Sequence, residues 1–133
     1  MKLIESAYLS HPIRGFRNCE NTGITAFNVR KAIAVATAIR LRLPWLSVYC
    51  PGEHQDFVSR TYHLGYLTDE QILNIDCEIM CERDLVIFYD PDVTFSTGMT
   101  KEKEVALEHG IQTITVHNLS EDFFEHLVVI TSN

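Results

Sequence analysis

The sequence predicts an α/β fold, in which a mostly parallel sheet of five strands carries helices on both faces. The chain has 133 residues, enough for a single domain over residues 1–133 with one hydrophobic core. Residues 85–88 (Leu-Val-Ile-Phe) form an apolar run without a polar side chain, as a central strand of a parallel sheet requires. Short apolar runs of this kind alternate along the chain with longer segments of helical character, which indicates a parallel sheet with helices on both faces.

Each expected element has a local signal. The strands are expected at residues 2–9, 45–50, 85–88, 111–117 and 127–130, the last as an edge strand. The helices are expected at residues 21–43, 53–67, 68–83 and 101–110, with a short final helix from residue 120. Thr68 and Gln71 have the spacing of a capping box, and Gly110 closes the helix that follows the central strand. The apolar stripe of the first, long helix is assigned to the core. This pattern is typical of flavodoxin-like or Rossmann-like domains.

Composition and charge exclude several classes of partner. The formal net charge is −7 and no basic cluster stands out, which argues against a nucleic-acid polymer. No apolar run approaches the roughly 20 residues that cross a membrane, so no membrane partner is expected. Residues 1–10 lack the form of a secretory signal, and we expect a cytoplasmic protein. A single nucleotide is compatible with this charge because it needs only a local pocket for an anion.

The four cysteines are Cys19, Cys50, Cys77 and Cys81. Cys77 and Cys81 lie four residues apart on an expected helix and could contact one metal ion. No pair has the tight C-x-x-C spacing. The favoured interpretation is therefore four reduced, mostly buried thiols in a cytosolic protein.

The polar loop after the central strand is the first candidate binding site. Residues 90–100 are rich in small and polar side chains, and a helix follows at 101–110. In α/β proteins ligands bind at this position, because free backbone N–H groups and the positive end of the helix dipole point out of the carboxyl edge of the sheet. Ser96 and Gly98 are interpreted as residues of an anion-binding loop, and Glu102 as a carboxylate in the first turn of the helix.

Other candidate residues have two interpretations each. Arg14, in the loop after the first strand, suits a clamp for phosphate or carboxylate and equally suits a surface ion pair. Asp76 is interpreted from periodicity alone as a surface charge. Glu102 taken alone is more often a glutamate that stabilises its own helix. Four further side chains could flank a nucleobase, although a packing or surface role is the more common one for each of them: His54, Tyr62, His63 and Tyr66.

Three stretches together resemble the nucleoside 2-deoxyribosyltransferase superfamily, and most closely its branch of 2'-deoxynucleoside 5'-phosphate N-hydrolases and cytidylate N-hydrolases. Residues 8–15 (YLSHPIRG) are similar to the family's first strand and the small-residue loop after it. Residues 96–106 (STGMTKEKEVA) resemble its second loop and the helix that carries its glutamate. Asp76, eight residues before Asp84, falls where the family places its acid. The order and spacing of these stretches carry the resemblance, which covers about two thirds of the chain in outline.

The resemblance implies a role for each matching residue. Glu102 would be the nucleophile that attacks the anomeric carbon of the sugar, and Asp76 the general acid or base near the nucleobase. The other matches would bind the substrate, chiefly its 5'-phosphate: Tyr8, Ser10, Pro12, Ile13, Arg14, Gly15, Ser96, Gly98 and Met99. The implied activity is hydrolysis of the N-glycosidic bond of a nucleoside 5'-monophosphate to free base and (deoxy)ribose 5-phosphate. It needs no metal and no cofactor, and a homodimer is expected because the family often completes its pocket from a second subunit.

Two alternatives remain on the same scaffold. The family's transferase branch, which accepts unphosphorylated nucleosides, commonly has an aspartate six residues before the glutamate. This chain has Ser96 there, whose hydroxyl can donate to a phosphate that a carboxylate would repel, so the hydrolase is favoured over a nucleoside 2-deoxyribosyltransferase. His11 and Phe16 stand where smaller residues are usual. Their bulk beside the predicted phosphate supports the second alternative, a catalytically inactive nucleotide-binding module.

The implied chemistry needs two carboxylates in different protonation states, as in retaining glycosidases. Glu102 is expected to stay ionised because it lies near a helix N-terminus. Asp76 must hold a proton at one stage, so partial burial that raises its pKa would help. The charged neighbours of Glu102 on the helix, Lys101, Lys103 and Glu104, are expected to face water.

Overall fold

The structure is a computed structural model, and it describes residues 3–13 and 22–132. The elements follow one another in the order β1 (Ser6–Ser10), α1 (Thr22–Arg42), β2 (Ser47–Tyr49), the 3-10 helix η2 (Pro51–His54), α2 (Gln55–His63), α3 (Asp69–Cys81), β3 (Leu85–Tyr89), α4 (Thr97–Glu108), β4 (Gln112–Val116) and α5 (Glu121–Thr131). The predicted α/β class is confirmed, and the strands of the sheet are all parallel.

The sheet of the described residues has four strands in the order β2-β1-β3-β4, so the expectation of five strands is wrong. Residues 127–130, expected as an edge strand, continue α5. Ser120 caps this helix by accepting a hydrogen bond from the Phe123 backbone N–H (3.2 Å), and Phe123, Phe124 and Leu127 bury one helical face. The strand order agrees with the first four strands of a flavodoxin-like sheet.

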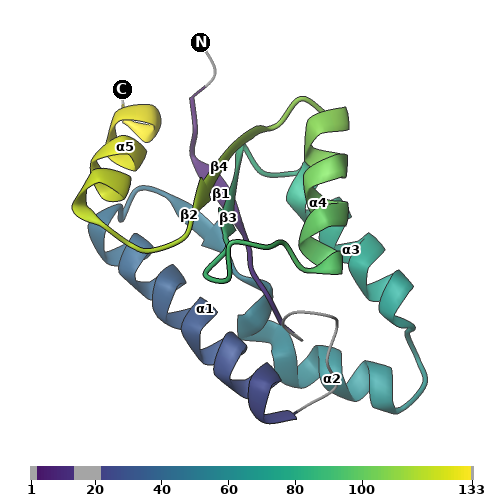
Figure 1. Cartoon of the computed structure of the whole chain (residues 1–133). Helices are drawn as coiled ribbons and strands as arrows, with labels where there is room; N and C mark the ends of the chain where they lie inside the picture. The colour runs from purple at the N-terminus through teal and green to yellow at the C-terminus, as the bar shows by residue number, and fades with distance from the viewer. Residues whose placement is uncertain (1–2, 14–21, 133) are drawn as a thin grey trace.

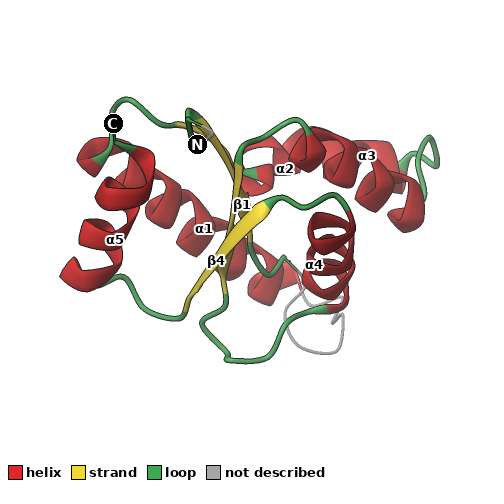
Figure 2. Cartoon of the chain, turned by 90° about the horizontal axis from the view of Figure 1, so that it is seen from above, coloured by secondary structure: helices red, strands yellow, loops and turns green. Residues whose placement is uncertain are grey.

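The sheet lies between two layers of helices, as Figures 1 and 2 show, and an apolar cluster packs on each of its faces. On one face, Ala7, Leu9 and Ile87 pack in a cluster with side chains of α1 and α5. On the other face, Tyr8 and Phe88 pack in a cluster with side chains of α3 and α4. All five residues of β3 are buried, which confirms the prediction that this segment is a central strand.

The connections between strands define a switch point at the carboxyl edge of the sheet. From β1 the chain passes through α1 to β2 on one side, whereas from β3 it passes through α4 to β4 on the other side. The helices α1 and α4 lie on opposite faces of the sheet (Figure 2). The segments that leave the neighbouring strands β1 and β3 therefore diverge, and such a switch point is where open α/β sheets bind ligands.

Two helix boundaries differ from the predictions. Helix α4 begins at Thr97, not at residue 101, because Ser96 acts as its N-cap and accepts a hydrogen bond from the Met99 backbone N–H (3.2 Å). Gly98 therefore lies in the first turn of the helix and Glu102 in its second turn. The segment expected as a helix at 53–67 is split into η2 and α2, which ends at His63.

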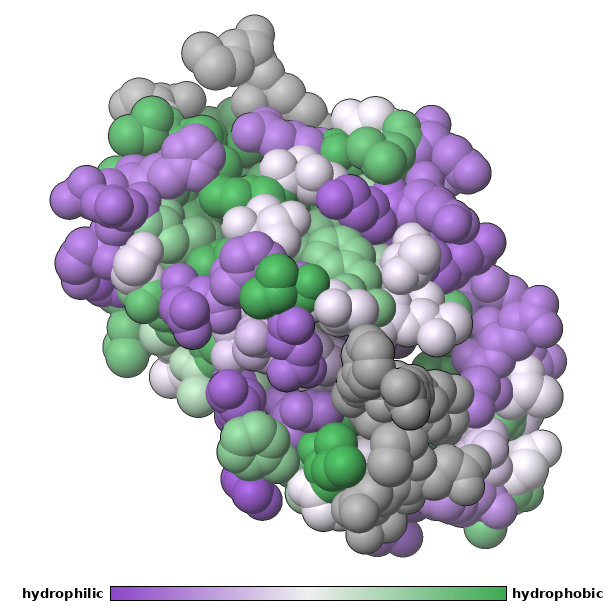
Figure 3. Space-filling view, viewed as in Figure 1, coloured by the Kyte–Doolittle hydropathy of each residue, from purple (hydrophilic) through white to green (hydrophobic). Residues whose placement is uncertain are grey.

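Other local signals are confirmed. Thr68 and Gln71 form the predicted capping box, with hydrogen bonds of 2.8 and 3.1 Å between each side chain and the other residue's backbone N–H. Gly110 follows α4 with a φ of 66°, a conformation that favours glycine. The outer side of α3 and α4 is largely hydrophilic in Figure 3, and Lys101 and Glu104 are exposed as expected.

Among the described helices, none combines the length and the apolar character needed to cross a bilayer.

Candidate active site

A buried carboxylate, Glu102, forms the centre of the candidate site. It projects from the face of α4 that packs on the sheet, and only 6% of the residue is exposed. The Ser10 hydroxyl donates a hydrogen bond to its Oε1 atom (2.9 Å), and the Tyr8 hydroxyl donates one to its Oε2 atom. Both carboxylate oxygens are thus held by side chains of β1.

Local sequence periodicity explains this arrangement. Tyr8 and Ser10 are two residues apart on a strand, so their side chains point to the same face of the sheet. Met99 and Ala106 lie three residues before and four residues after Glu102, and both are buried on the same face of α4. Glu102 is therefore a carboxylate in an otherwise apolar helix stripe. This pattern distinguishes it in the sequence from an ordinary surface glutamate.

Burial controls the ionisation of Glu102. Desolvation raises the pKa of its carboxyl to about 7, although the hydrogen bonds from Tyr8 and Ser10 favour the ionised form and lower the pKa. The expectation that the helix N-terminus keeps Glu102 fully ionised is therefore wrong, because the residue lies in the second turn and is desolvated. Burial and the nearby Glu102 carboxylate raise the pKa of Tyr8, so the Tyr8 hydroxyl keeps its proton and serves as a donor.

Asp76 is the second carboxylate of the site. It lies on α3 and is partly buried, so the interpretation as a surface charge is wrong. Desolvation raises its pKa to about 6. The negative charge of Asp76 also raises the pKa values of Glu102 and Tyr8, which indicates that the three groups are close enough to interact electrostatically. Helix periodicity alone could not identify this position, because it depends on how α3 docks beside α4.

A cavity of about 1060 Å³ joins these groups. Seven predicted site residues line it: Tyr8, Ile13, Asp76, Ser96, Gly98, Met99 and Glu102. Two other predicted residues, Ser10 and Pro12, do not line the cavity. Ser10 is fully buried and contacts Glu102, and the Pro12 carbonyl accepts a hydrogen bond from the His11 ring. Arg14 and Gly15, together with Phe16 and Cys19, lie outside the described residues.

His11 is buried and forms part of the cavity wall. Its Nδ1 atom donates to the Pro12 carbonyl (3.0 Å) and its Nε2 atom accepts from the Gly52 backbone N–H (3.0 Å). Desolvation lowers the pKa of His11 to about 4, so the ring is neutral at physiological pH. A Cβ atom at Gly52 would lie 3.2 Å from the ring, which explains why a glycine suits this position. His11 therefore connects the end of β1 to η2.

The remaining walls come from α1 and α2, whose side chains were assigned mainly to packing or surface roles. Val29 and Ile33 of α1 line the cavity, so the apolar stripe of this helix serves the site as well as the core. Tyr62 and His63 of α2 also line it, whereas His54 and Tyr66 do not. A strand-forming or helical pattern cannot reveal such a wall, since it arises only when α1 and α2 come together at the end of the sheet.

The described lining of the cavity is acidic. Besides Asp76 and Glu102, it contains four further carboxylates, from Glu53, Asp56, Asp69 and Glu70. Arg30 is the only arginine or lysine among the described lining residues. One of the carboxylates, Glu53, is paired with Arg40 at 2.6 Å. An anionic ligand would therefore need its own local donors, of which the start of α4 is one source.

No group of three or more histidine, cysteine, aspartate or glutamate side chains within residues 3–13 and 22–132 is arranged to hold a metal ion. Comparisons of the chain with protein-family models, with curated proteins and with solved structures find no match. The functional interpretation therefore depends on the geometry of the site itself and on the resemblance of its motifs.

Proposed function

We propose that the protein hydrolyses the N-glycosidic bond of a nucleoside 5'-monophosphate, releasing the free base and a (deoxy)ribose 5-phosphate. The observation that carries the proposal is the buried Glu102 carboxylate, held by Tyr8 and Ser10 beside a cavity that Asp76 also lines. A desolvated carboxylate with fixed orientation suits attack on a developing oxocarbenium ion, and a second carboxylate suits proton transfer. The three stretches of the resemblance contribute these same groups.

The proposed reaction has two steps. In the first, Glu102 bonds to the anomeric carbon while the bond to the base breaks, and Asp76 gives its proton to the leaving base. In the second, Asp76 takes a proton from a water molecule that attacks the same carbon and releases Glu102 as a carboxylate. The pKa of Asp76, raised to about 6, is compatible with both roles near neutral pH.

The start of α4 is the proposed site for the 5'-phosphate. Ser96 and Gly98 line the cavity, and the first backbone N–H groups of a helix, with the positive end of its dipole, favour an anion. The Ser96 Oγ atom accepts from the Met99 N–H (3.2 Å) and keeps its own hydroxyl proton to donate. The resemblance implies that Arg14 would add a cation.

The proposal is tested with a panel of ribo- and deoxyribonucleoside 5'-monophosphates and the matching nucleosides, with chromatography to detect released base. We expect at least one monophosphate to be cleaved, and its nucleoside to be cleaved less efficiently. Absence of cleavage across the panel by the folded protein would contradict hydrolysis. If a nucleotide then stabilises the protein thermally to the same extent in the wild type and in Glu102→Ala, the inactive binding module is supported instead.

Ser96→Ala tests the phosphate site, with Ser120→Ala as a matched control. Each serine caps a helix by accepting from a backbone N–H at 3.2 Å, so each variant should lose about 1 kcal/mol of stability. Only Ser96 lines the cavity. We expect Ser96→Ala alone to raise the KM for the monophosphate, by about tenfold for the loss of one hydrogen bond to a charged group. Equal KM values in the two variants would contradict the assigned phosphate position.

The acidic lining favours one second candidate, a deoxyribosyltransferase that acts on unphosphorylated nucleosides. Among the described lining residues six carboxylates face one arginine, which disfavours an anion over a neutral sugar. The same Glu102 intermediate would then be attacked by a second base instead of water. A deoxynucleoside supplied with a different free base distinguishes the two activities, because the transferase yields an exchanged nucleoside without net hydrolysis.

The expected homodimer stays a prediction.

A further inference from the structure

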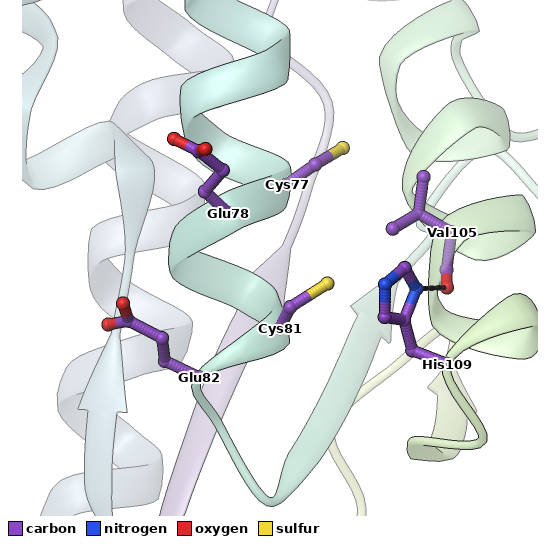
Figure 4. Close-up of a pocket in the computed structure, with 6 residues that line it drawn as sticks. All are labelled: Cys77, Glu78, Cys81, Glu82, Val105 and His109. Atoms are coloured by element: carbon purple, nitrogen blue, oxygen red, sulfur yellow. Dashed lines mark hydrogen bonds between the residues drawn. The ribbon is translucent and has the colours of Figure 1, made fainter.

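A second cavity, of about 490 Å³, lies between α3 and α4 and shares no residue with the candidate active site. It is lined by Cys77, Glu78, Cys81, Glu82, Val105 and His109 (Figure 4). Cys77 and Cys81 are one helical turn apart, and Figure 4 shows both sulfur atoms on the side of α3 that faces α4. The carboxylates of Glu78 and Glu82 point away from this gap.

His109 lines the same cavity from the opposite helix. Its Nδ1 atom contacts the Val105 carbonyl at 2.9 Å, and a carbonyl can only accept, so Nδ1 carries the proton. The lone pair of Nε2 is consequently available to a metal ion. Figure 4 shows the imidazole ring between the two helices, opposite Cys81. A histidine that donates its other ring N–H to a backbone carbonyl is the usual arrangement of a metal-ligating histidine.

We propose that Cys77 and Cys81 bind one Cu(I) ion through their sulfur atoms. The two cysteines and His109 are not preformed as a three-ligand group, so the His109 Nε2 atom joins as an auxiliary ligand only when the ion is bound. Soft thiolate ligands select Cu(I), which is satisfied by two of them. Zn²⁺ fits less well because a structural site requires four ligands, and no group of three is preformed among the described residues. Both cysteines are free thiols, so each releases its proton on binding: one Cu(I) and two thiols give a bis-thiolate complex and two protons.

The cavity also suits a cation by its composition and access. Its described lining contains neither lysine nor arginine. Cys77 is buried and Cys81 is partly exposed, so an ion can reach the pair from the side of Cys81 while Cys77 shields it from water. Cys50, the other described cysteine, is buried in the core cluster on the opposite face of the sheet and takes no part in this cavity.

The test is a titration of the reduced protein with Cu(I) under anaerobic conditions, in competition with a colorimetric Cu(I) chelator. We expect one ion per chain to be taken from the chelator. Cys77→Ala and Cys81→Ser should each weaken the affinity by more than about 100-fold, because loss of a ligand exceeds the 10- to 100-fold effect of losing an outer partner. His109→Gln should weaken it about tenfold. Cys50→Ala removes a thiol elsewhere and should bind as the wild type does.

Each outcome decides the proposal. Equal affinities of the wild type and of Cys81→Ser would overturn it, as would failure of the wild type to compete with the chelator. Equal loss in Cys50→Ala and Cys81→Ser would also overturn it, since binding would then follow the number of thiols and not the pair. Circular dichroism monitors folding, and if the buried Cys77→Ala variant does not fold, the partly exposed Cys81 decides alone. Glycosidase activity is not a readout, so the result is independent of the proposed function.

Discussion

Glu102→Gln is expected to abolish glycosidic cleavage, lowering kcat by at least about 10⁴-fold, which is the scale of losing a nucleophile. The amide keeps the volume of the side chain and can still bond to both hydroxyls, accepting at its oxygen from one and donating its NH2 to the other, but it cannot bond to the anomeric carbon. Steady-state kinetics with the best substrate of the panel measure the loss, and calorimetry measures nucleotide affinity, which should be largely retained.

The same variant should change how stability depends on pH. Burial raises the pKa of Glu102 from its usual 4.5 to about 7, so the folded protein binds more protons than the unfolded chain between these values. Stability from this group is complete below about pH 4.5 and is lost as the pH rises through about 7. The loss corresponds to about 3 kcal/mol. Glu102→Gln should therefore be the more stable protein at pH 8 and close to the wild type at pH 4.

Glu104→Gln is the matched control for both measurements. It removes a carboxylate from the same helix, but Glu104 is exposed and does not line the cavity. We expect wild-type kinetics and an unchanged pH dependence of unfolding. Turnover by Glu102→Gln close to that of the wild type would exclude the nucleophile role, whatever the effect on stability.

Asp76→Asn is expected to lower kcat by about 10²- to 10⁴-fold, as for the loss of a general acid or base. The active form needs Asp76 protonated and Glu102 ionised, so wild-type activity should be highest between about pH 6 and 7. Above about pH 7 it should fall, because the acid form of Asp76 is depleted without further gain from ionisation of Glu102. This limb should disappear in the variant. The rising limb, from ionisation of Glu102, should move to lower pH because the charge of Asp76 raises the pKa of Glu102. The two apparent values belong to the coupled pair.

A substrate with a better leaving group separates acid catalysis from other roles of Asp76. Such a substrate needs less protonation of the base, so the defect of Asp76→Asn should shrink with it. Glu70→Gln removes an exposed carboxylate from the wall of the same cavity and should change neither the pH profile nor the dependence on the leaving group. A defect of the same size for good and poor leaving groups would argue against the assignment of Asp76 as the acid.

Elements with strong local signals could be predicted from the sequence. The central strand β3 is an uninterrupted apolar run, and α3 begins at a complete capping box. The prediction of a strand at residues 127–130 was wrong because the β-branched side chains of Val128, Val129 and Ile130 also suit a strand. The cap at Ser120 and burial of Leu127 against the core instead extend α5 through this segment. A short apolar run does not by itself distinguish the two structures.

The candidate site was only partly predictable for a similar reason. Glu102 interrupts an apolar helix stripe, and this local feature is visible in the sequence. The position of Asp76 depends on the docking of α3, and the wall formed by Val29 and Tyr62 depends on α1 and α2 meeting at the end of the sheet. The raised pKa of Glu102 follows from burial under those segments, which outweighs the influence of the helix dipole.

The hydrogen bonds between β1 and Glu102 connect residues that are 92 and 94 positions apart in the chain. Contacts of such long sequence separation close large loops and raise the contact order, so they form late relative to single helices. Catalytic competence should consequently be acquired only with the global folding transition. During synthesis, no ribosome-bound chain shorter than the first 102 residues can contain a complete site.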